Sequence, residues 1–318
     1  MAGLVATGGA RAIPRHRMRD GEGPRSGDRT LVLGADGQLG RAFRDMYRGD
    51  TDVDFLTRTE LDLAAPAPFD AVDLSPYAAV INAAAYSSVD AAETPAGRAA
   101  AWAVNATAVG ALARACTRHG ATLVQVSSSH VFDGRVQVHD EDEPLSPLGV
   151  FGASKAAGDI AAASAPRHYI VRSSWIVGDG NNFVTAMAWL AARGLRTEAP
   201  NDRYGRLTFT PDLAAAVRHL LATAAPYGTY NVSNAGPVQS RADIAADVHE
   251  MLGCPRDSVT GVPAARYAAG RPGAAPRPAH STLNLAKIEA AGFHPPPAHE
   301  ALARFLRGWK WGRALWHP

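Results

Sequence analysis

Short apolar runs alternate with stretches of helical spacing along the first half of the chain. The apolar runs that predict strands are residues 31–33, 53–56, 78–82, 122–127 and 169–172. The stretches that predict helices are residues 39–47, 96–119 and 154–163. Strand, helix and strand, repeated with short connections, are typical of a parallel sheet covered by helices on both faces. We therefore predict an α/β fold with a Rossmann-like parallel sheet.

The second half of the chain has a less regular pattern. Helical spacing predicts helices at 183–193, 211–224 and 241–252, and an apolar run predicts a strand at 228–232. Residues 263–278 are rich in Ala, Arg, Gly and Pro, which favours a surface loop. This half is expected to form a smaller C-terminal part.

Charge and composition exclude several classes of protein. The 318 residues include 32 Lys or Arg and 30 Asp or Glu, so little positive charge is left to neutralise nucleic-acid phosphates. Cys116 and Cys254 alone provide neither a disulfide framework nor a cysteine metal site. No apolar run approaches the roughly 20 residues that cross a bilayer, and the N-terminus lacks the apolar region of a signal peptide. We expect a cytoplasmic protein that binds no nucleic acid, membrane or metal; the sequence carries no signal of its oligomeric state.

A glycine-rich turn follows the first predicted strand and opens the first predicted helix. It reads G-x-x-G-x-x-G, and its candidate cofactor residues are Gly34, Gly37, Gln38, Leu39 and Gly40. Small residues let the backbone approach a pyrophosphate, whose charge is favoured by the free N–H groups at a helix N-terminus. The turn therefore predicts a dinucleotide site. A turn that needs glycine only for close packing is the alternative.

The sequence is expected to form three segments. Residues 1–28 are interpreted as a flexible leader, with a basic arm for a partner as the alternative. Residues 29–178 are expected to form the Rossmann dinucleotide-binding domain, and residues 179–318 mainly a substrate-binding domain, partly interleaved with the first. The last residues carry Trp309, Trp311 and Trp316, which predict a packed amphipathic tail or, alternatively, a partner surface.

The end of the second strand indicates which dinucleotide is bound. A carboxylate is expected there if the ribose 2′-hydroxyl of NADH is bound, whereas this chain has Arg58. An arginine can accept the 2′-phosphate of NADPH. We therefore predict NADPH, with NADH as the alternative cofactor and an ordinary solvated arginine as the alternative role of Arg58.

Short motifs from residue 30 to residue 307 carry a resemblance to a known family. They are 37–40 (GQLG), 62–63 (DL), 82–86 (NAAAY), 89–93 (VDAAE), 104–105 (VN), 131–134 (VFDG), 152–155 (GASK), 182–183 (NF) and 277–278 (RP). Together they resemble extended short-chain dehydrogenases/reductases, and among these the dTDP-4-dehydrorhamnose reductases. The resemblance implies that Lys155 binds the nicotinamide ribose. It also implies further cofactor contacts from Asp62, Leu63, Ala84, Ala85 and Tyr86.

The chain departs from that family at the expected proton donor. The family pairs a Tyr with the Lys four residues later, and this chain has Phe151 before Lys155. A phenyl ring has no proton to give, although Ser128 keeps the hydroxyl that polarises the carbonyl. The neighbouring Ser129 and His130 also replace family residues. The residues expected to face substrate are Ser129, His130, Phe151, Trp175, Asn182 and Tyr204.

Three functions are compatible with Phe151. The first is a ketoreductase of a small-molecule ketone whose proton comes from a phenol of the substrate, from water or from His130. A chain of this kind that lacks the Tyr resembles ketoreductases of antibiotic biosynthesis that act on angucyclinones. The resemblance implies an aromatic polyketide substrate, which has phenols beside its ketone, and this is the main prediction. A structural hydrogen bond is the alternative role of His130. The second function is a dTDP-4-dehydro-6-deoxysugar reductase, and the third is a noncatalytic NADP-binding regulatory subunit.

Overall fold

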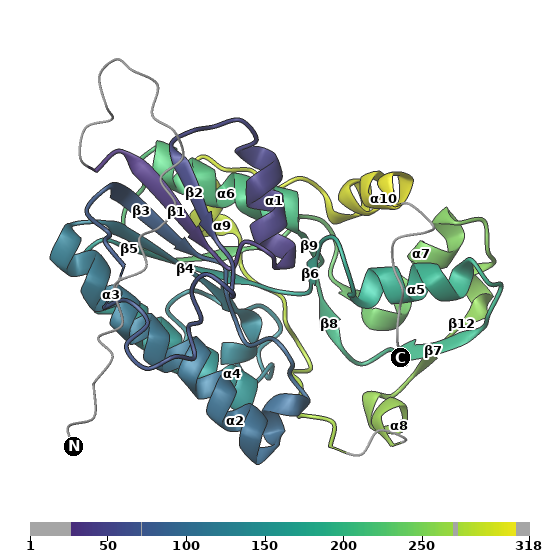
Figure 1. The fold of residues 1–318 in the computed structure, drawn as a ribbon. Coiled ribbons are helices and arrows are strands. Elements are labelled where there is room, and N and C mark those ends of the chain that lie inside the picture. The colour runs from purple at the N-terminus through teal and green to yellow at the C-terminus, as the bar shows by residue number, and fades with distance from the viewer. Residues whose placement is uncertain (1–26, 71, 270–272, 310–318) are drawn as a thin grey trace, which may run out of the picture.

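The computed structural model describes residues 27–70, 72–269 and 273–309. Nearly all of the predicted leader, together with Trp311 and Trp316, lies outside these residues. Six parallel strands form the central sheet, in the order β10-β5-β4-β3-β1-β2 (Figure 1). The strands are β1 (Arg29–Leu33), β2 (Val53–Leu56), β3 (Tyr77–Asn82), β4 (Thr122–Ser128), β5 (His168–Ser173) and β10 (Gly228–Val232). The predicted α/β class with a Rossmann-like sheet is confirmed.

Alternating side chains of the strands build two cores, one on each face of the sheet. On β1, Leu31 and Leu33 face one core and Val32 faces the other, as the two-residue period of a strand requires. The first core is covered by α3 and α4, and the second by α1 and α6. These helices are α1 (Gln38–Met46), α3 (Ala108–His119), α4 (Val150–Ala163) and α6 (Thr210–Ala222). The strands are buried on both sides, which explains their nearly continuous apolar runs.

Two helical segments differ from their predicted bounds. The stretch predicted at 96–119 is α2 (Pro95–Trp102), a π-helical turn (Ala103–Thr107) and α3 in direct succession. Helix α4 begins at Val150, four residues before its predicted start. Its first turn is stabilised from outside the helix, because the Val150 N–H donates to Glu93 Oε1 at 2.8 Å. Phe151 and Lys155 therefore lie one turn apart on the same helix.

The C-terminal half returns to the sheet before it forms a core of its own. Strand β10 pairs with β5, and α6 packs against α1. A third apolar core joins α5, α7 and α10 to the short strands beside them (Figure 1). The helices of this half are α5 (Phe183–Ala191), α7 (Arg241–Met251), α8 (Ala264–Ala268), α9 (Ala286–Ala290) and α10 (Ala298–Gly308). Its short strands are β6 (Ile176–Val177), β7 (Thr197–Pro200), β8 (Tyr204–Gly205), β9 (Thr208–Phe209), β11 (Gln239–Ser240) and β12 (Val259–Val262).

Two local predictions for this half need comment. The loop predicted at 263–278 contains the short helix α8, so it is not irregular throughout. Leu306 lies in α10, and Trp309 just after it packs against the third core. Within the described residues, no helix is both long enough and apolar enough to cross a membrane. The proposed boundary at residue 178 stays a prediction.

Candidate active site

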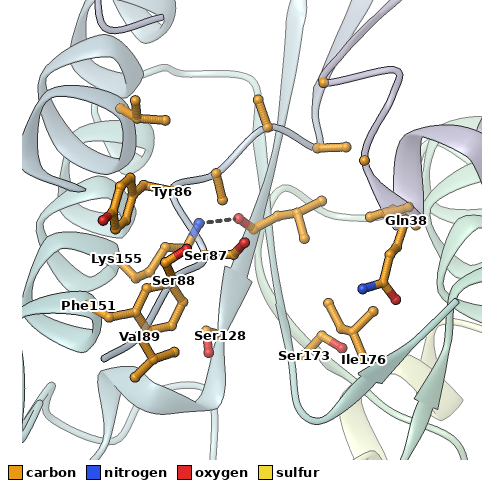
Figure 2. Close-up of a pocket in the computed structure, with 18 of the residues that line it drawn as sticks. Gln38, Tyr86, Ser87, Ser88, Val89, Ser128, Phe151, Lys155, Ser173 and Ile176 are labelled. Atoms are coloured by element: carbon orange, nitrogen blue, oxygen red, sulfur yellow. Dashed lines mark hydrogen bonds between the residues drawn. The ribbon is translucent and has the colours of Figure 1, made fainter. Parts of the chain in front are cut away.

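A cavity of about 1270 Å³ opens at the carboxyl ends of the sheet strands. Its wall includes the residues that follow β1, β2 and β3 and the ends of β4 and β5. The strand order changes direction between β1 and β3, and ligands of open α/β sheets bind at such a switch point. In Figure 2, Tyr86, Lys155, Phe151 and Ser128 lie toward one side of this cavity, and Gln38 and Ile176 toward the other.

The glycine turn forms the floor of the cavity beneath the N-terminus of α1. Gly34 has φ 76°, and a Cβ there would lie 2.7 Å from the backbone of Ala84. Gly37 lines the cavity, and a Cβ there would lie 3.2 Å from the Gly34 carbonyl oxygen, so a larger side chain would crowd a turn whose backbone a pyrophosphate can approach. Gly40 does not line the cavity. A Cβ there would lie 2.2 Å from the same oxygen, and its role is to pack α1 against the turn.

Gln38 connects the glycine turn to the C-terminal half. Its Oε1 accepts from the Gly178 N–H at 3.0 Å, and its Nε2 donates to the Asn181 carbonyl at 3.1 Å. Both bonds cross from α1 to the segment that leads into α5. Gln38 thereby fixes one wall of the cavity relative to the other (Figure 2). Its neighbour Leu39 also lines the cavity.

Arg58 and Asp62 lie at the end of the cavity beside β2. The Arg58 side chain is 82% exposed and its Nε lies 3.6 Å from Asp62 Oδ1. An exposed guanidinium can turn toward a phosphate, and the neighbouring carboxylate holds it near the cavity. Leu63 completes this end. Arg58 therefore lies where the sequence predicts an arginine that accepts the 2′-phosphate of NADPH.

The loop after β3 carries Ala84, Ala85 and Tyr86, and all three line the cavity. Asn105, in the π-helical turn, holds this loop: its Oδ1 accepts from the Tyr86 N–H at 2.9 Å and its Nδ2 donates to the Tyr86 carbonyl at 3.1 Å. The Tyr86 ring points toward α2, where a Cβ added at Gly97 would lie 2.9 Å from its hydroxyl. π-Helical turns occur often at functional sites, as here.

Lys155 is buried on α4 and its Nζ donates to the Val126 carbonyl at 2.7 Å (Figure 2). Burial lowers the pKa of Lys155 to about 8, and the negative charge of Asp159 partly opposes that shift. Phe151 lies one turn earlier and faces the same cavity. Ser128, at the end of β4, accepts from the His130 N–H at 3.2 Å, and this bond leaves its own hydroxyl proton free. The lysine and the serine are therefore in place, and a phenyl ring stands where the family has its proton donor.

His130 lines the cavity and meets the Phe151 ring edge to face at 5.5 Å. Burial and, to a smaller extent, the positive charges of Arg277 and Arg241 lower the pKa of His130 to about 4. The imidazole is therefore neutral near pH 7. A neutral imidazole is a weak acid, so this environment does not favour His130 as the proton donor.

Of the other residues predicted to face the substrate, two line the cavity and two do not. Trp175 lines the cavity, and its backbone has φ 44°. Asn182 also lines it, but its side chain caps α5 through Thr185 and donates to Gly178. Ser129 is fully buried and Tyr204 stacks on His280, and neither is among the lining residues. The turn after Ser128 directs Ser129 into the protein, which a strand-by-strand alignment cannot reveal.

Several lining residues on the C-terminal half were not predicted as site residues, among them Phe183, Arg241 and Arg277. Arg277 was noticed only as part of an RP motif, and its Nη2 pairs with Asp90 at 2.9 Å. Arg241 is the first residue of α7. The sequence predicts that a helix begins at Arg241. It does not predict that the N-terminus of this helix lies at the cavity.

The sheet, the glycine turn and the lysine of α4 define the class of the protein as a Rossmann-type NAD(P)H-dependent reductase. The chain matches the family described as RmlD substrate binding domain over residues 28–310, and it belongs to that family.

Two curated relatives and one solved structure agree with this assignment. The chain is 35% identical over 277 residues to the dTDP-4-dehydrorhamnose reductase of Mycobacterium tuberculosis (strain ATCC 25618 / H37Rv), covering 84% of this chain and 88% of that protein. It is 36% identical over 277 residues to the dTDP-4-dehydrorhamnose reductase of Streptomyces griseus, covering 84% and 89%. The structure of dTDP-4-dehydrorhamnose reductase from Bacillus anthracis str. Ames in complex with NADP superposes with a TM-score of 0.81 at 29% identity, covering 89% of this chain and 100% of that one.

Proposed function

We propose that this chain is an NADPH-dependent ketoreductase that works without a tyrosine proton donor. The observation that carries the proposal is the cavity wall on α4, where Lys155 is buried and correctly spaced but Phe151 replaces the phenol. The glycine turn leaves the space that a pyrophosphate needs, and Arg58 offers a charge for a 2′-phosphate. The described residues therefore fit NADPH, and the solved structure from Bacillus anthracis is a complex with NADP.

Each residue near the ketone has a separate task. When bound, NADPH supplies the hydride that reduces the carbonyl carbon. The Lys155 ammonium, anchored on the Val126 carbonyl, would donate to the ribose hydroxyls of bound NADPH. The free hydroxyl proton of Ser128 hydrogen-bonds to the carbonyl oxygen and stabilises the negative charge that develops there. Phe151 contributes packing alone.

The proton must then come from a group other than Lys155, Ser128 and Phe151. A phenol beside the ketone, already hydrogen-bonded to its oxygen, can give that proton as the hydride arrives and later recover one from solvent. His130 is neutral near pH 7, and the Tyr86 hydroxyl lies against α2. His130 is the side chain that the sequence analysis offers as a proton donor, and Tyr86 is a phenol that also lines the cavity. A donor carried by the substrate therefore accounts best for Phe151.

We propose an aromatic polyketide as the substrate, of the angucyclinone type found in antibiotics such as simocyclinone, with reduction in the cytoplasm. Support comes from the phenol that such a ketone carries and from the aromatic wall formed by Phe151, Trp175 and Phe183. The unpaired thiols of Cys116 and Cys254 suit a reducing compartment.

The second candidate is reduction of a dTDP-4-dehydro-6-deoxysugar. It is favoured by the names of the curated relatives, which cover most of this chain, and on that evidence it is the better supported of the two substrates. Phe151 argues against it, because a sugar ketone has no acidic phenol and loss of a general acid typically costs about 10²- to 10⁴-fold in rate.

One assay separates these substrates. NADPH oxidation is followed with an angucyclinone ketone and, in parallel, with dTDP-4-dehydrorhamnose at equal concentration. The proposal predicts turnover of the polyketide at least tenfold faster than that of the sugar nucleotide. Faster turnover of the sugar nucleotide would establish the second candidate. Turnover of neither, with NADPH bound, would favour a noncatalytic binding subunit.

A further inference from the structure

Arg241 is a cation without a counter-charge on the substrate side of the cavity. Its guanidinium lies over the Trp175 ring, 3.9 Å from the centroid, and 4.6 Å from the centroid of the Phe183 ring. Across the residues that the structure describes, its side chain has neither a hydrogen bond nor an ion pair. Aromatic faces attract a cation, but they carry no net negative charge to neutralise it.

The surroundings make this charge costly to maintain. Burial and, to a smaller extent, the positive charge of Arg277 lower the pKa of Arg241 to about 9, although Tyr267 partly opposes that shift. Taking a charge out of water without a partner is unfavourable, and a like charge nearby adds to the cost. A bound anion would remove both costs at once.

The acidic residues of the cavity wall do not serve as that anion. Asp90 pairs with Arg277 at 2.9 Å, and Asp62 lies beside Arg58 at the end near β2. Asp36 and Asp179 also line the cavity, and neither forms an ion pair with Arg241 among the described residues. Arg277 is thus already neutralised in part, whereas Arg241 is not. The missing negative charge must be supplied by a ligand.

The rings beside Arg241 fix where its guanidinium points. Trp175 is backed by Gly205, where a Cβ would lie 3.0 Å from the indole ring. The guanidinium lies over this indole, and Arg241 lines the cavity, where a ligand can reach its N–H groups. His130 and Phe151, which mark the expected position of the ketone, line the same cavity, and the charge of Arg241 reaches His130.

We propose that Arg241 binds an anionic group of the substrate, so that the natural ketone is negatively charged on the side that faces α7. This inference rests on the proposed ketone reduction and adds a specificity-determining residue to it. The shared chemistry is an oxyanion presented to a guanidinium edge. The diphosphate of a sugar nucleotide can supply it, and so can the carboxylate or phenolate of an aromatic polyketide.

Binding to the NADP⁺-saturated protein tests the inference without turnover. Calorimetry compares two matched pairs of probes, dTDP with thymidine and 1-hydroxy-2-naphthoate with 1-naphthol. We expect at least one anion to bind tenfold or more tightly than its neutral partner. That preference should disappear in Arg241→Met and survive in part in Arg241→Lys, which keeps the charge. The pair that shows the preference identifies the source of the anion.

A matched control and a stability measurement keep the result interpretable. Arg266→Gln removes an arginine that is exposed, paired with Glu198 at 2.6 Å and absent from the cavity wall, and it should keep the full preference. Melting temperature and NADPH affinity are measured for every variant. Equal binding of charged and neutral probes would overturn the inference. So would a preference unchanged in Arg241→Met, or a tenfold loss of NADPH affinity in that variant. Anion binding without ketone reduction would instead overturn the proposed function alone.

Discussion

We propose that cofactor choice depends on Arg58. Its side chain is exposed, lines the cavity and has only a 3.6 Å approach to Asp62, so it is free to bind a 2′-phosphate. Charge-assisted hydrogen bonds of this kind contribute about 1.5–3 kcal/mol. Sequence position alone indicated this role, because the end of the second strand of a Rossmann sheet lies beside the adenosine ribose.

We predict that Arg58→Asp weakens NADPH binding by roughly ten- to a hundredfold and leaves NADH binding within about threefold, from the loss of those bonds. Fluorescence titration of both cofactors measures this. Arg48→Asp is the control, because Arg48 is exposed, pairs with Asp45 and lies off the cavity wall. Equal affinity of the unmutated protein for NADPH and NADH would contradict the assignment.

Lys155 makes cofactor binding depend on pH. Since burial lowers its pKa to about 8, the ammonium is charged below that pH and loses its proton above it. If the charged form holds the ribose hydroxyls, NADPH affinity is highest near pH 7 and falls as pH rises through 8. We predict up to about a tenfold weakening between pH 7.5 and 9.5, given that each pKa unit is worth about 1.4 kcal/mol.

The binding curve of Lys155→Met provides the control for this pH effect. That variant has no ammonium, so its NADPH affinity should be weaker at pH 7 and nearly constant over the same range. A flat profile in the unmutated protein would show that the charge of Lys155 does not contribute to binding.

At the scale of elements, the glycine turn and helix α1 have separable tasks. Gly37 leaves open the space for pyrophosphate, whereas Gly40 allows α1 to pack on the turn. We predict that Gly37→Val weakens NADPH at least tenfold with a small change in the free energy of unfolding. Gly40→Ala should instead cost about 1–3 kcal/mol of stability, because its Cβ overpacks the backbone.

Gly110→Ala in α3 is the matched control for both. A Cβ there meets atoms only at 3.6 Å and beyond, so alanine should be neutral or stabilise the helix by up to about 1 kcal/mol. Denaturant unfolding and NADPH titration separate the two effects. A Gly37→Val variant that binds NADPH normally would show the turn to be structural only.

The start of α4 shows what local sequence could not predict. The helical pattern was visible only from residue 154, since the first turn holds two glycines and no capping side chain. Its cap comes from Glu93, far away along the chain. The same limit applies to Ser129, which the short turn after β4 buries, and to Arg241, which α7 brings to the cavity. Local periodicity places strands and helices, but it does not place their ends relative to one another.

Across the whole molecule, the sheet was predictable because its strands are buried on both faces and read as apolar runs. All five strands expected in the first half lie in it, together with β10 from the second half. The short strands around α5 and α7 were missed, because pieces of two to four residues carry no measurable period. Gln38 joins these regions through Gly178 and Asn181, so the cavity depends on both halves of the chain.

The central claim is that the ketone is reduced without a proton from the Tyr slot. Its most direct test is single-turnover NADPH oxidation with an angucyclinone ketone, measured for the unmutated protein, for Phe151→Tyr and for the substrate methylated on the phenol beside the ketone. We predict that Phe151→Tyr changes the rate less than about threefold, since the hydride step does not wait for that hydroxyl. Methylation should lower the rate by about 10²-fold or more, the usual value of a general acid. A rise of about 10²-fold in Phe151→Tyr, or full activity on the methylated substrate, would contradict the account.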